Sequence, residues 1–453
     1  MRTCPLLALF PVFALTMSAP RAVAEPFRDG DRVCLVGDSI TSGGVYHADI
    51  QLFYATRYPT RNIVWFNCGH SGGSAGECLR RIDWDVLEHR PTAATVSFGM
   101  NDMSGIYPEP VEENIAKRID WNIKAYTQVL DKLTAVGARL TLVGPSPYDD
   151  TAQLPAKLER SNLAMTRWTE RLGKLAGERG CGFADLGAVM NPVNAKLQAA
   201  DPKATLIGGD RVHPGPVGHA VMAYAILKAQ GVDGDVARIT LDAASGQPGK
   251  LANCAVSAVE RGAAGISFTV AEQALPFVLP AAAHGALALV PLTDELNREL
   301  LTVSGLAAGR YALSIDGAEV GTWTAAELAA GVNLATCEKT PQYQQAQALA
   351  KINEERNSLE AGHVRCRAFV RHSLLTAAKV DPNDEAAVIA FCQARIEGKS
   401  QDKYTYDDWM ARQFVLNVAP KWPETVARID AIVRQMAVDR QPKPHRFSLT
   451  RQD

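Results

Sequence analysis

Short apolar runs alternate with longer amphipathic stretches between Arg32 and Gly231, and this alternation constrains the fold more than any other feature. The short runs are β-branched or aromatic in character and bounded by Gly, Asn or Pro, as strands are. The longer runs space their apolar residues by three and four, as amphipathic helices do. Strands and helices that alternate in this way predict a parallel sheet with helices on both faces. The predicted strands are Arg32–Val36, Asn62–Asn67, Ala93–Phe98, Arg139–Val143 and Gly182–Leu186, and helices are predicted over Val111–Val136 and Ala156–Glu178.

After about Asp233 the sequence changes character, and 453 residues are too many for one ordinary domain. Residues 236–330 are rich in Ala, Gly, Val and Leu with turn signals, and they predict short antiparallel strands. One hairpin there carries Trp323, which we interpret as a core residue or as a platform for a sugar ring. From Thr340 onward the chain is mostly helical and charged, and it ends in a polar, proline-containing tail. The predicted units are residues 25–232, a β-rich region over 233–336 and a helical region over 337–453.

The first 24 residues have the three parts of a signal peptide in order. A positive start is followed by the apolar run Leu6–Met17 and then by the small-x-small pattern that ends at Ala24. The apolar run is shorter than the roughly 20 residues that span a bilayer. We therefore expect cleavage after Ala24, a secreted or periplasmic protein, and no insertion into the membrane.

Charge and cysteine usage exclude several partners. The formal net charge is −2, and no basic stripe with interleaved aromatic residues is present, so nucleic acid is not an expected partner. No Cys-x-x-Cys pair or His-rich cluster predicts a structural zinc site. Cys34 lies in an apolar strand and is expected to be a buried free thiol, whereas Cys366 and Cys392 fall on consecutive predicted helices and could form a disulfide. The sequence does not indicate an oligomeric state.

Two segments at predicted strand ends contain the residue types of nucleophilic catalysis. Ser39 follows the first strand within Gly37-Asp38-Ser39, and a serine needs such an exposed turn and a nearby base to become a nucleophile. Asp210 and His213 are three residues apart in a turn, where a carboxylate can orient an imidazole and stabilise its charged form. The carboxyl ends of parallel strands meet at one edge of a sheet, so these residues are expected to share a cleft.

Two further strand ends supply candidate donors to an oxyanion. The second strand leads into Asn67-Cys68-Gly69-His70-Ser71-Gly72-Gly73, where glycine lets a backbone N–H approach a substrate oxygen closely. The alternative for this segment is a tight strand-to-helix turn. The third strand leads into Asn101, whose side-chain N–H is a natural second donor, and into Asp102, which we interpret as a structural hydrogen-bonding residue.

These four segments, in this order, resemble blocks I, II, III and V of the SGNH hydrolases, also called the GDSL family. The resemblance covers about residues 30–232 and implies a flavodoxin-like three-layer α/β/α fold that needs no metal or cofactor. It further implies Ser39 as the nucleophile, with Asp210 and His213 as the rest of the triad.

The same resemblance implies three oxyanion donors, namely the Ser39 backbone N–H, the Gly72 backbone N–H and the Asn101 side chain. The choice of Gly72 over Gly69 or Gly73 rests on matching Ser71-Gly72 to the Ser-Gly pair of the family. The loop after the serine, Ser42-Gly43-Gly44, has only small side chains. Tyr46 or His47, which follow this loop, could line the substrate cleft or pack at a helix start.

The predicted activity is that of a secreted serine esterase whose substrate is a small-molecule or glycan ester. Exported members with extra regions resemble carbohydrate O-acetylesterases, which makes that activity our first expectation. The alternatives are a lysophospholipase or arylesterase, an acetyltransferase that uses the same triad, and a carbohydrate-binding protein on a hydrolase scaffold.

Overall fold

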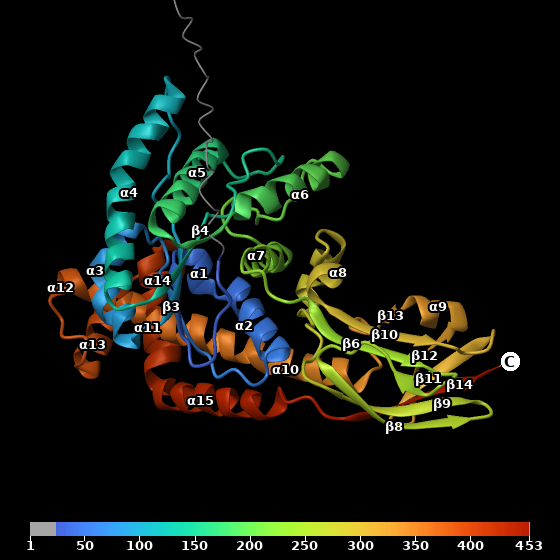
Figure 1. The fold of residues 1–453 in the computed structure, drawn as a ribbon. Coiled ribbons are helices and arrows are strands. Elements are labelled where there is room, and N and C mark those ends of the chain that lie inside the picture. Colours follow the sequence, from blue (N-terminus) through green and yellow to red (C-terminus); the bar gives the residue numbers. More distant parts are fainter. Residues whose placement is uncertain (1–23, 453) are drawn as a thin grey trace, which may run out of the picture.

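A five-stranded parallel sheet lies at the centre of the N-terminal half of the chain, in the order β2-β1-β3-β4-β5. The structure is a computed structural model that describes residues 24–452, so the predicted signal peptide lies almost wholly outside the described residues. The three layers of this α/β/α unit are shown in Figure 1. The predicted fold class is thereby confirmed. Its strands are β1 (Arg32–Gly37), β2 (Val64–Gly69), β3 (Ala93–Ser97), β4 (Arg139–Val143) and β5 (Gly182–Ala184), and its helices are α1 (Ser39–Gly43), α2 (Val45–Arg57), α3 (Ala75–Asp85), the 3₁₀ turn η1 (Leu87–His89), α4 (Val111–Ala135), α5 (Asn162–Arg179), α6 (Leu186–Ala200) and α7 (Pro216–Ala229).

Both faces of this sheet are buried, as the nearly continuous apolar strands predict. In β1, Cys34 and Val36 face the core under α3, α4 and α5, whereas Val33 and Leu35 face the core under α2, α6 and α7. Because side chains alternate along a strand, this one strand contributes to both cores.

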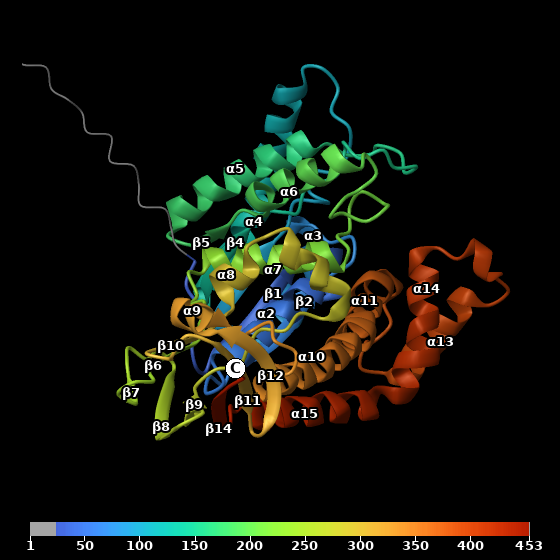
Figure 2. The same cartoon turned by 90° about the vertical axis from the view of Figure 1, so that its right-hand side faces the viewer.

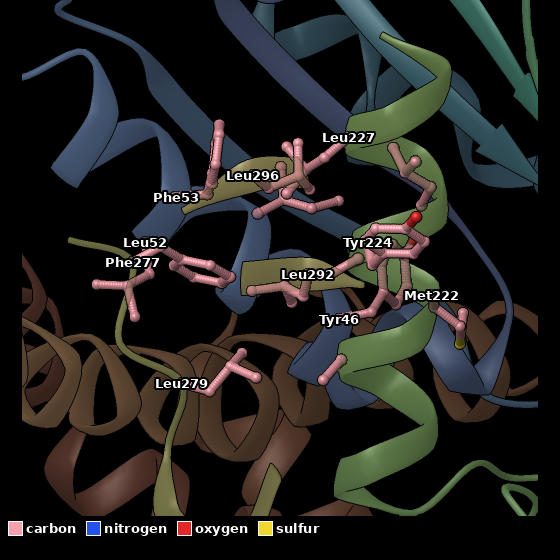
Figure 3. Close-up of a cluster of buried hydrophobic side chains, with 14 of the residues drawn as sticks. Tyr46, Leu52, Phe53, Met222, Tyr224, Leu227, Phe277, Leu279, Leu292 and Leu296 are labelled. Atoms are coloured by element: carbon pink, nitrogen blue, oxygen red, sulfur yellow. The ribbon is translucent and has the colours of Figure 1, made fainter. Parts of the chain in front are cut away.

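The core on the α2 and α7 side continues into a later part of the chain. Phe53 of α2 lies against Phe277, with ring centroids 5.5 Å apart, and Leu292 and Leu296 pack in the same cluster (Figure 3). Residues 275–296 therefore form an apolar strap across the helices that cover the sheet. Buried apolar area of this kind is the main source of stability in such contacts.

Residues 235–333 and the end of the chain form a β-sandwich at one side of the molecule (Figure 1). One sheet has the order β13-β10-β6-β7 and the other β12-β11-β14-β9-β8, and their inner faces share one apolar core against which Trp323 packs. The predicted strands are present, although β6 and β10 pair in parallel, not antiparallel. The elements are β6 (Asp235–Asp242), β7 (Gln247–Pro248), β8 (Cys254–Gly262), β9 (Gly265–Glu272), η2 (Ala281–Ala288), α8 (Leu292–Leu296), β10 (Arg298–Ser304), β11 (Arg310–Ile315), β12 (Ala318–Thr324), α9 (Ala325–Ala330), β13 (Val332–Asn333) and β14 (His445–Arg451).

Strand β14 differs from the polar tail expected at the end of the chain. It lies between β9 and β11, and Phe447 and Leu449 are buried in the sandwich core. Its alternation of buried and exposed residues is that of a half-buried strand, but it is short and follows two prolines. Long-range pairing decides its conformation.

Helices α10 to α15 pack beside the catalytic sheet, and α15 leads back toward the β-sandwich (Figures 1 and 2). The expected disulfide in this region is wrong, because Cys366 and Cys392 are both buried free thiols in one apolar cluster. Among residues 24–452, no helix has the length and apolar character needed to cross a bilayer. The elements here are α10 (Pro341–Leu359), the π-helical turn η3 (Glu360–Val364), α11 (Arg365–Phe369), the π-helical turn η4 (Val370–Leu375), α12 (Thr376–Ala378), α13 (Glu385–Ile396), the 3₁₀ turn η5 (Gln401–Lys403), α14 (Tyr406–Gln413), the π-helical turn η6 (Phe414–Val418), the 3₁₀ turn η7 (Ala419–Lys421) and α15 (Trp422–Asp439).

Candidate active site

Ser39 stands at the junction of β1 and α1, where the sheet edge opens into a cleft. Asp38 caps α1, and its Oδ1 accepts a hydrogen bond of 3.0 Å from the Ile40 N–H, which fixes the turn. Burial raises the pKa of Asp38 to about 6. The end of β2 lies so close that a Cβ on Gly69 would stand 2.1 Å from the Ser42 nitrogen, so only glycine fits there.

His213 connects the serine to a carboxylate. Ser39 Oγ lies 2.8 Å from His213 Nε2, and His213 Nδ1 lies 2.6 Å from Asp210 Oδ2. The second oxygen of Asp210 accepts the backbone N–H groups of Val212 and His213, each at 3.0 Å. Partial burial raises the pKa of Asp210, but these hydrogen bonds outweigh that effect and lower it. The carboxylate therefore stays charged, holds Nδ1 protonated and leaves Nε2 free to accept the serine proton.

Arg211 fixes the loop that carries this histidine. Its backbone has a φ of +69°, a region that few residues other than glycine adopt. Its buried guanidinium donates to the carbonyl oxygens of Asp149, Ala152, Leu154 and Ala156 at distances of 2.8–2.9 Å. These bonds tie the histidine loop to the segment after β4, which explains why α5 begins at Asn162 and not at the expected Ala156.

Gly72 and Asn101 face the same cleft as Ser39. Gly72 has a φ of +74°, the left-handed conformation that favours glycine. One hydrogen of the Asn101 amide is donated to the Gly73 carbonyl oxygen at 2.9 Å, which leaves the second hydrogen for a ligand. Asp102 has the structural role predicted for it, because its Oδ1 accepts the Ala75 N–H at 3.0 Å.

Tyr46 and His47 do not line the cleft, and the expectation that they contact substrate is wrong. Both side chains are buried at the start of α2. Tyr46 Oη lies 3.0 Å from Thr41 Oγ1, and His47 Nε2 lies 3.1 Å from the Thr41 carbonyl oxygen. Burial lowers the pKa of His47 to about 3, so its ring is neutral. The alternative expectation, packing at the helix start, describes them correctly.

The opposite side of the cleft comes from the C-terminal helices, a contribution that the sequence did not reveal. The cleft has a volume of about 1130 Å³ and includes residues of η3, α11, η4, α14 and η6. We call this set of helices, residues 341–439, the helical wall. His363 also lies here. The signal that could have shown this wall is weak, since its lining residues are scattered over 60 positions and form no motif.

Buried polar contacts attach the helical wall to the catalytic sheet. Arg365 donates to both carboxylate oxygens of Asp85, at 2.9 and 2.8 Å, and to the Asn67 carbonyl oxygen at 2.9 Å. Burial raises the pKa of Asp85, but the charge of Arg365 outweighs it and lowers the pKa. Ser373 Oγ lies 2.9 Å from His70 Nε2, and Tyr406 donates to Ser71 Oγ at 2.8 Å. The wall therefore contacts the loop at His70 and Ser71, directly before Gly72.

His70, Glu77 and His372 form a buried cluster whose ligand atoms all lie within 4.8 Å of one another. His372 Nε2 is 2.6 Å from Glu77 Oε1, and the buried Arg81 lies 3.3 Å from the same carboxylate. Burial raises the pKa of Glu77, but His372 and Arg81 lower it to about 2. The cationic Arg81 at this distance repels a divalent ion, so we interpret the cluster as a contact between the wall and the sheet.

Comparison with known proteins agrees with this geometry. The GDSL-like Lipase/Acylhydrolase family matches residues 35–221. An acetylxylan esterase of Geobacillus stearothermophilus is 25% identical over 220 residues, which are 45% of this chain and 95% of that protein. The solved structure of a gut microbial diltiazem-metabolizing enzyme is 32% identical, with a TM-score of 0.85, and the match covers 95% of this chain and 99% of the other. The similarity to the latter thus includes the β-sandwich and the helical wall.

Proposed function

Since the chain belongs to the SGNH/GDSL hydrolase family and is a carboxylic ester hydrolase, we propose that it is an exported carbohydrate O-acetylesterase with Ser39, His213 and Asp210 as its triad. The observation that carries the proposal is the hydrogen-bonded series from Ser39 Oγ through His213 to Asp210, with distances of 2.8 and 2.6 Å. The similarity to an acetylxylan esterase supports the choice of an acetylated glycan. The signal-like residues 1–24 support export.

In the proposed reaction, His213 Nε2 accepts the proton of Ser39 as Oγ attacks the acetyl carbonyl carbon. The negative oxygen that forms is held by the backbone N–H groups of Ser39 and Gly72 and by the side chain of Asn101. His213 then gives the proton to the leaving sugar oxygen, and an acetyl group remains on Ser39. Water attacks this acetyl-enzyme with the same base, which releases acetate and restores the serine.

The test is acetate release from acetylated xylooligosaccharides by the purified protein and by Ser39→Ala. We expect the variant to lose at least about 10⁴-fold in kcat/KM, because the triad acts as one unit. Ser257→Ala, at an exposed serine of β8, is the matched control and should retain full activity. Retained activity in Ser39→Ala with unchanged circular dichroism would refute the assignment.

The same assay separates the other activities. A lysophospholipase or arylesterase would prefer long acyl chains or aryl esters, so rates are compared across acyl chain lengths. An acetyltransferase would transfer acetate to an added sugar acceptor instead of releasing it. A binding protein would retain the ligand and release no product. Export is tested separately, since mass measurement of the mature protein should place its first residue at Glu25.

A further inference from the structure

Two large aromatic side chains stand exposed on the helical wall, in the same cleft as Ser39. Tyr406 and Trp409 are one turn apart on α14 and are 52% and 47% exposed, and both line the cleft. Their rings are stacked, with centroids 6.0 Å apart and planes inclined by 28°. Exposed aromatic residues that gather inside a cleft, and not on an open surface, indicate a ligand that covers them.

Neighbouring contacts hold the pair in place. The rings of Phe369 and Tyr406 form an edge-to-face pair, with centroids 5.3 Å apart and planes inclined by 86°, and the Tyr406 hydroxyl donates to Ser71 Oγ at 2.8 Å. We call the rings of Tyr406 and Trp409 the platform, and the hydrogen bond to Ser71 fixes it to the loop that carries Gly72. A ligand lying on these rings would be held at a defined place relative to the oxyanion donors.

Polar groups around the two rings suit a hydroxylated ligand. Asn417 Nδ2 donates to Gln413 Oε1 at 2.6 Å, which orients both amides and leaves the Gln413 amino group and the Asn417 carbonyl oxygen for a ligand. His363 Nδ1 lies 2.6 Å from Thr425 Oγ1, so its other ring nitrogen is available to the cleft. A pyranose ring combines an apolar C–H face with a rim of hydroxyl groups, and it therefore matches both kinds of contact.

The backbone of the wall gives independent support. It contains three π-helical turns, η3, η4 and η6, and each places a side chain in the cleft, namely His363, Ser373 and Asn417 respectively. A π-helical turn widens the helix by one residue at the expense of regular hydrogen bonding, and such turns concentrate at functional sites. Three of them on the face toward Ser39 indicate that this face is shaped for a ligand.

We propose that Tyr406 and Trp409 form the subsite that binds the sugar ring bearing the ester, with Trp409 as the main stacking face. This inference rests on the proposed function and identifies the part of the molecule that selects the alcohol half of the substrate. The acetyl group would point to Ser39 while the ring lies against the helical wall.

The experiment compares kcat/KM for an acetylated xylooligosaccharide with kcat/KM for ethyl acetate, which has no ring. In Trp409→Ala we expect the ratio of the two to fall at least tenfold, mainly through a higher KM for the sugar ester. Trp409→Phe keeps an aromatic face and should recover most of the ratio. Trp121→Ala, at a 73% exposed tryptophan on α4 away from the cleft, is the matched control and should leave the ratio unchanged.

An unchanged ratio in a folded Trp409→Ala would overturn the subsite. Phenyl acetate serves as a third substrate, and a loss in Trp409→Ala confined to it would overturn the sugar assignment in favour of an aryl ester. A wild-type protein that cleaves ethyl acetate but no acetylated sugar would also overturn the sugar assignment. Ethyl acetate hydrolysis that persists in Ser39→Ala would instead refute the proposed triad. Should Trp409→Ala fail to fold, quenching of tryptophan fluorescence is compared between wild type and Trp409→Phe, because the chain has seven tryptophans. Protection from quenching by non-acetylated xylooligosaccharide that is present in the wild type and smaller in Trp409→Phe would support the subsite, and equal protection in the two proteins would overturn it.

Discussion

The two sides of the cleft are built in different ways. On the sheet side, segments that follow strands hold Ser39, Gly72 and Asn101, the loop before α7 holds His213, and each segment carries a local motif. On the side of the helical wall, the lining residues come from helices and π-helical turns spread over 60 positions without a motif. This difference indicates that catalysis requires a few residue types in a fixed local geometry. Ligand recognition, in contrast, can use side chains from any surface that packs beside the catalytic residues.

A second histidine–aspartate pair shows that the geometry of such a pair does not by itself make it catalytic. His445 Nδ1 lies 2.6 Å from Asp316 Oδ2 in the β-sandwich, the same distance as between His213 and Asp210. In both pairs the second carboxylate oxygen accepts a backbone N–H, at 2.8 Å from Arg446 and at 3.0 Å from His213. Of these two histidines, His213 has a serine hydroxyl at its other nitrogen, whereas Nε2 of His445 has no hydrogen-bond partner among the described residues. The neighbouring Ser39, and not the histidine–aspartate pair itself, distinguishes the two sites.

The largest expected effect distinguishes the Asp210–His213 pair from the Asp316–His445 pair. Asp210→Asn should lower kcat by about 10³–10⁴-fold, because the amide cannot hold the required tautomer or stabilise the charged imidazole. Asp316→Asn makes the same chemical change at the matched pair and should leave kcat within twofold of wild type. Steady-state kinetics on p-nitrophenyl acetate checks both. Equal losses in the two variants would show that the effect is one of stability and not of catalysis.

The next effect concerns the attachment of the helical wall. Arg365→Ala should lower the free energy of unfolding by about 3 kcal/mol, the low end for a broken buried ion pair, because Arg81 remains beside Asp85. Arg428→Ala removes an exposed pair with Glu355 and should leave the stability close to that of the wild type, because solvent screens such a pair. Urea unfolding measures both. Similar values for the two variants would show that the buried contact does not hold the wall.

The smallest effect is the pH dependence of stability that Asp38 causes on the sheet side of the cleft. The folded-state pKa of Asp38 is about 6, above the roughly 3.9 of an unfolded aspartate, so the native state binds more protons between these values. Stability contributed by Asp38 is therefore present below about pH 4 and is lost as the pH rises to about 6. Asp38→Asn should remove this decline and raise stability at pH 8 by about 1–3 kcal/mol. Unfolding measured from pH 4 to pH 8 tests it, and a decline equal to that of wild type would contradict it.

Much of the fold and the chemistry of the catalytic half were predictable. Strands buried on both faces leave nearly continuous apolar runs, and the one at Arg139–Val143 has the predicted limits. The segment of Asp210 and His213 was recognisable because both groups lie in one turn. The prediction for Tyr46 and His47 failed because sequence proximity to Ser39 does not give the direction of a side chain, and α2 turns both into the core.

By itself the sequence determined which residues can do chemistry, because a motif such as Gly37-Asp38-Ser39 or Asp210-x-x-His213 is held together by contacts between near neighbours. Only the tertiary structure decided that β14 completes a distant sheet, that Cys366 and Cys392 stay unpaired, and that the helical wall closes the cleft. The last of these outcomes depends on contacts between residues some 300 positions apart, such as Arg365 with Asp85 and Tyr406 with Ser71. Long-range packing leaves no periodic signal in the chain, and for that reason the esterase chemistry was predictable and the surface facing it was not.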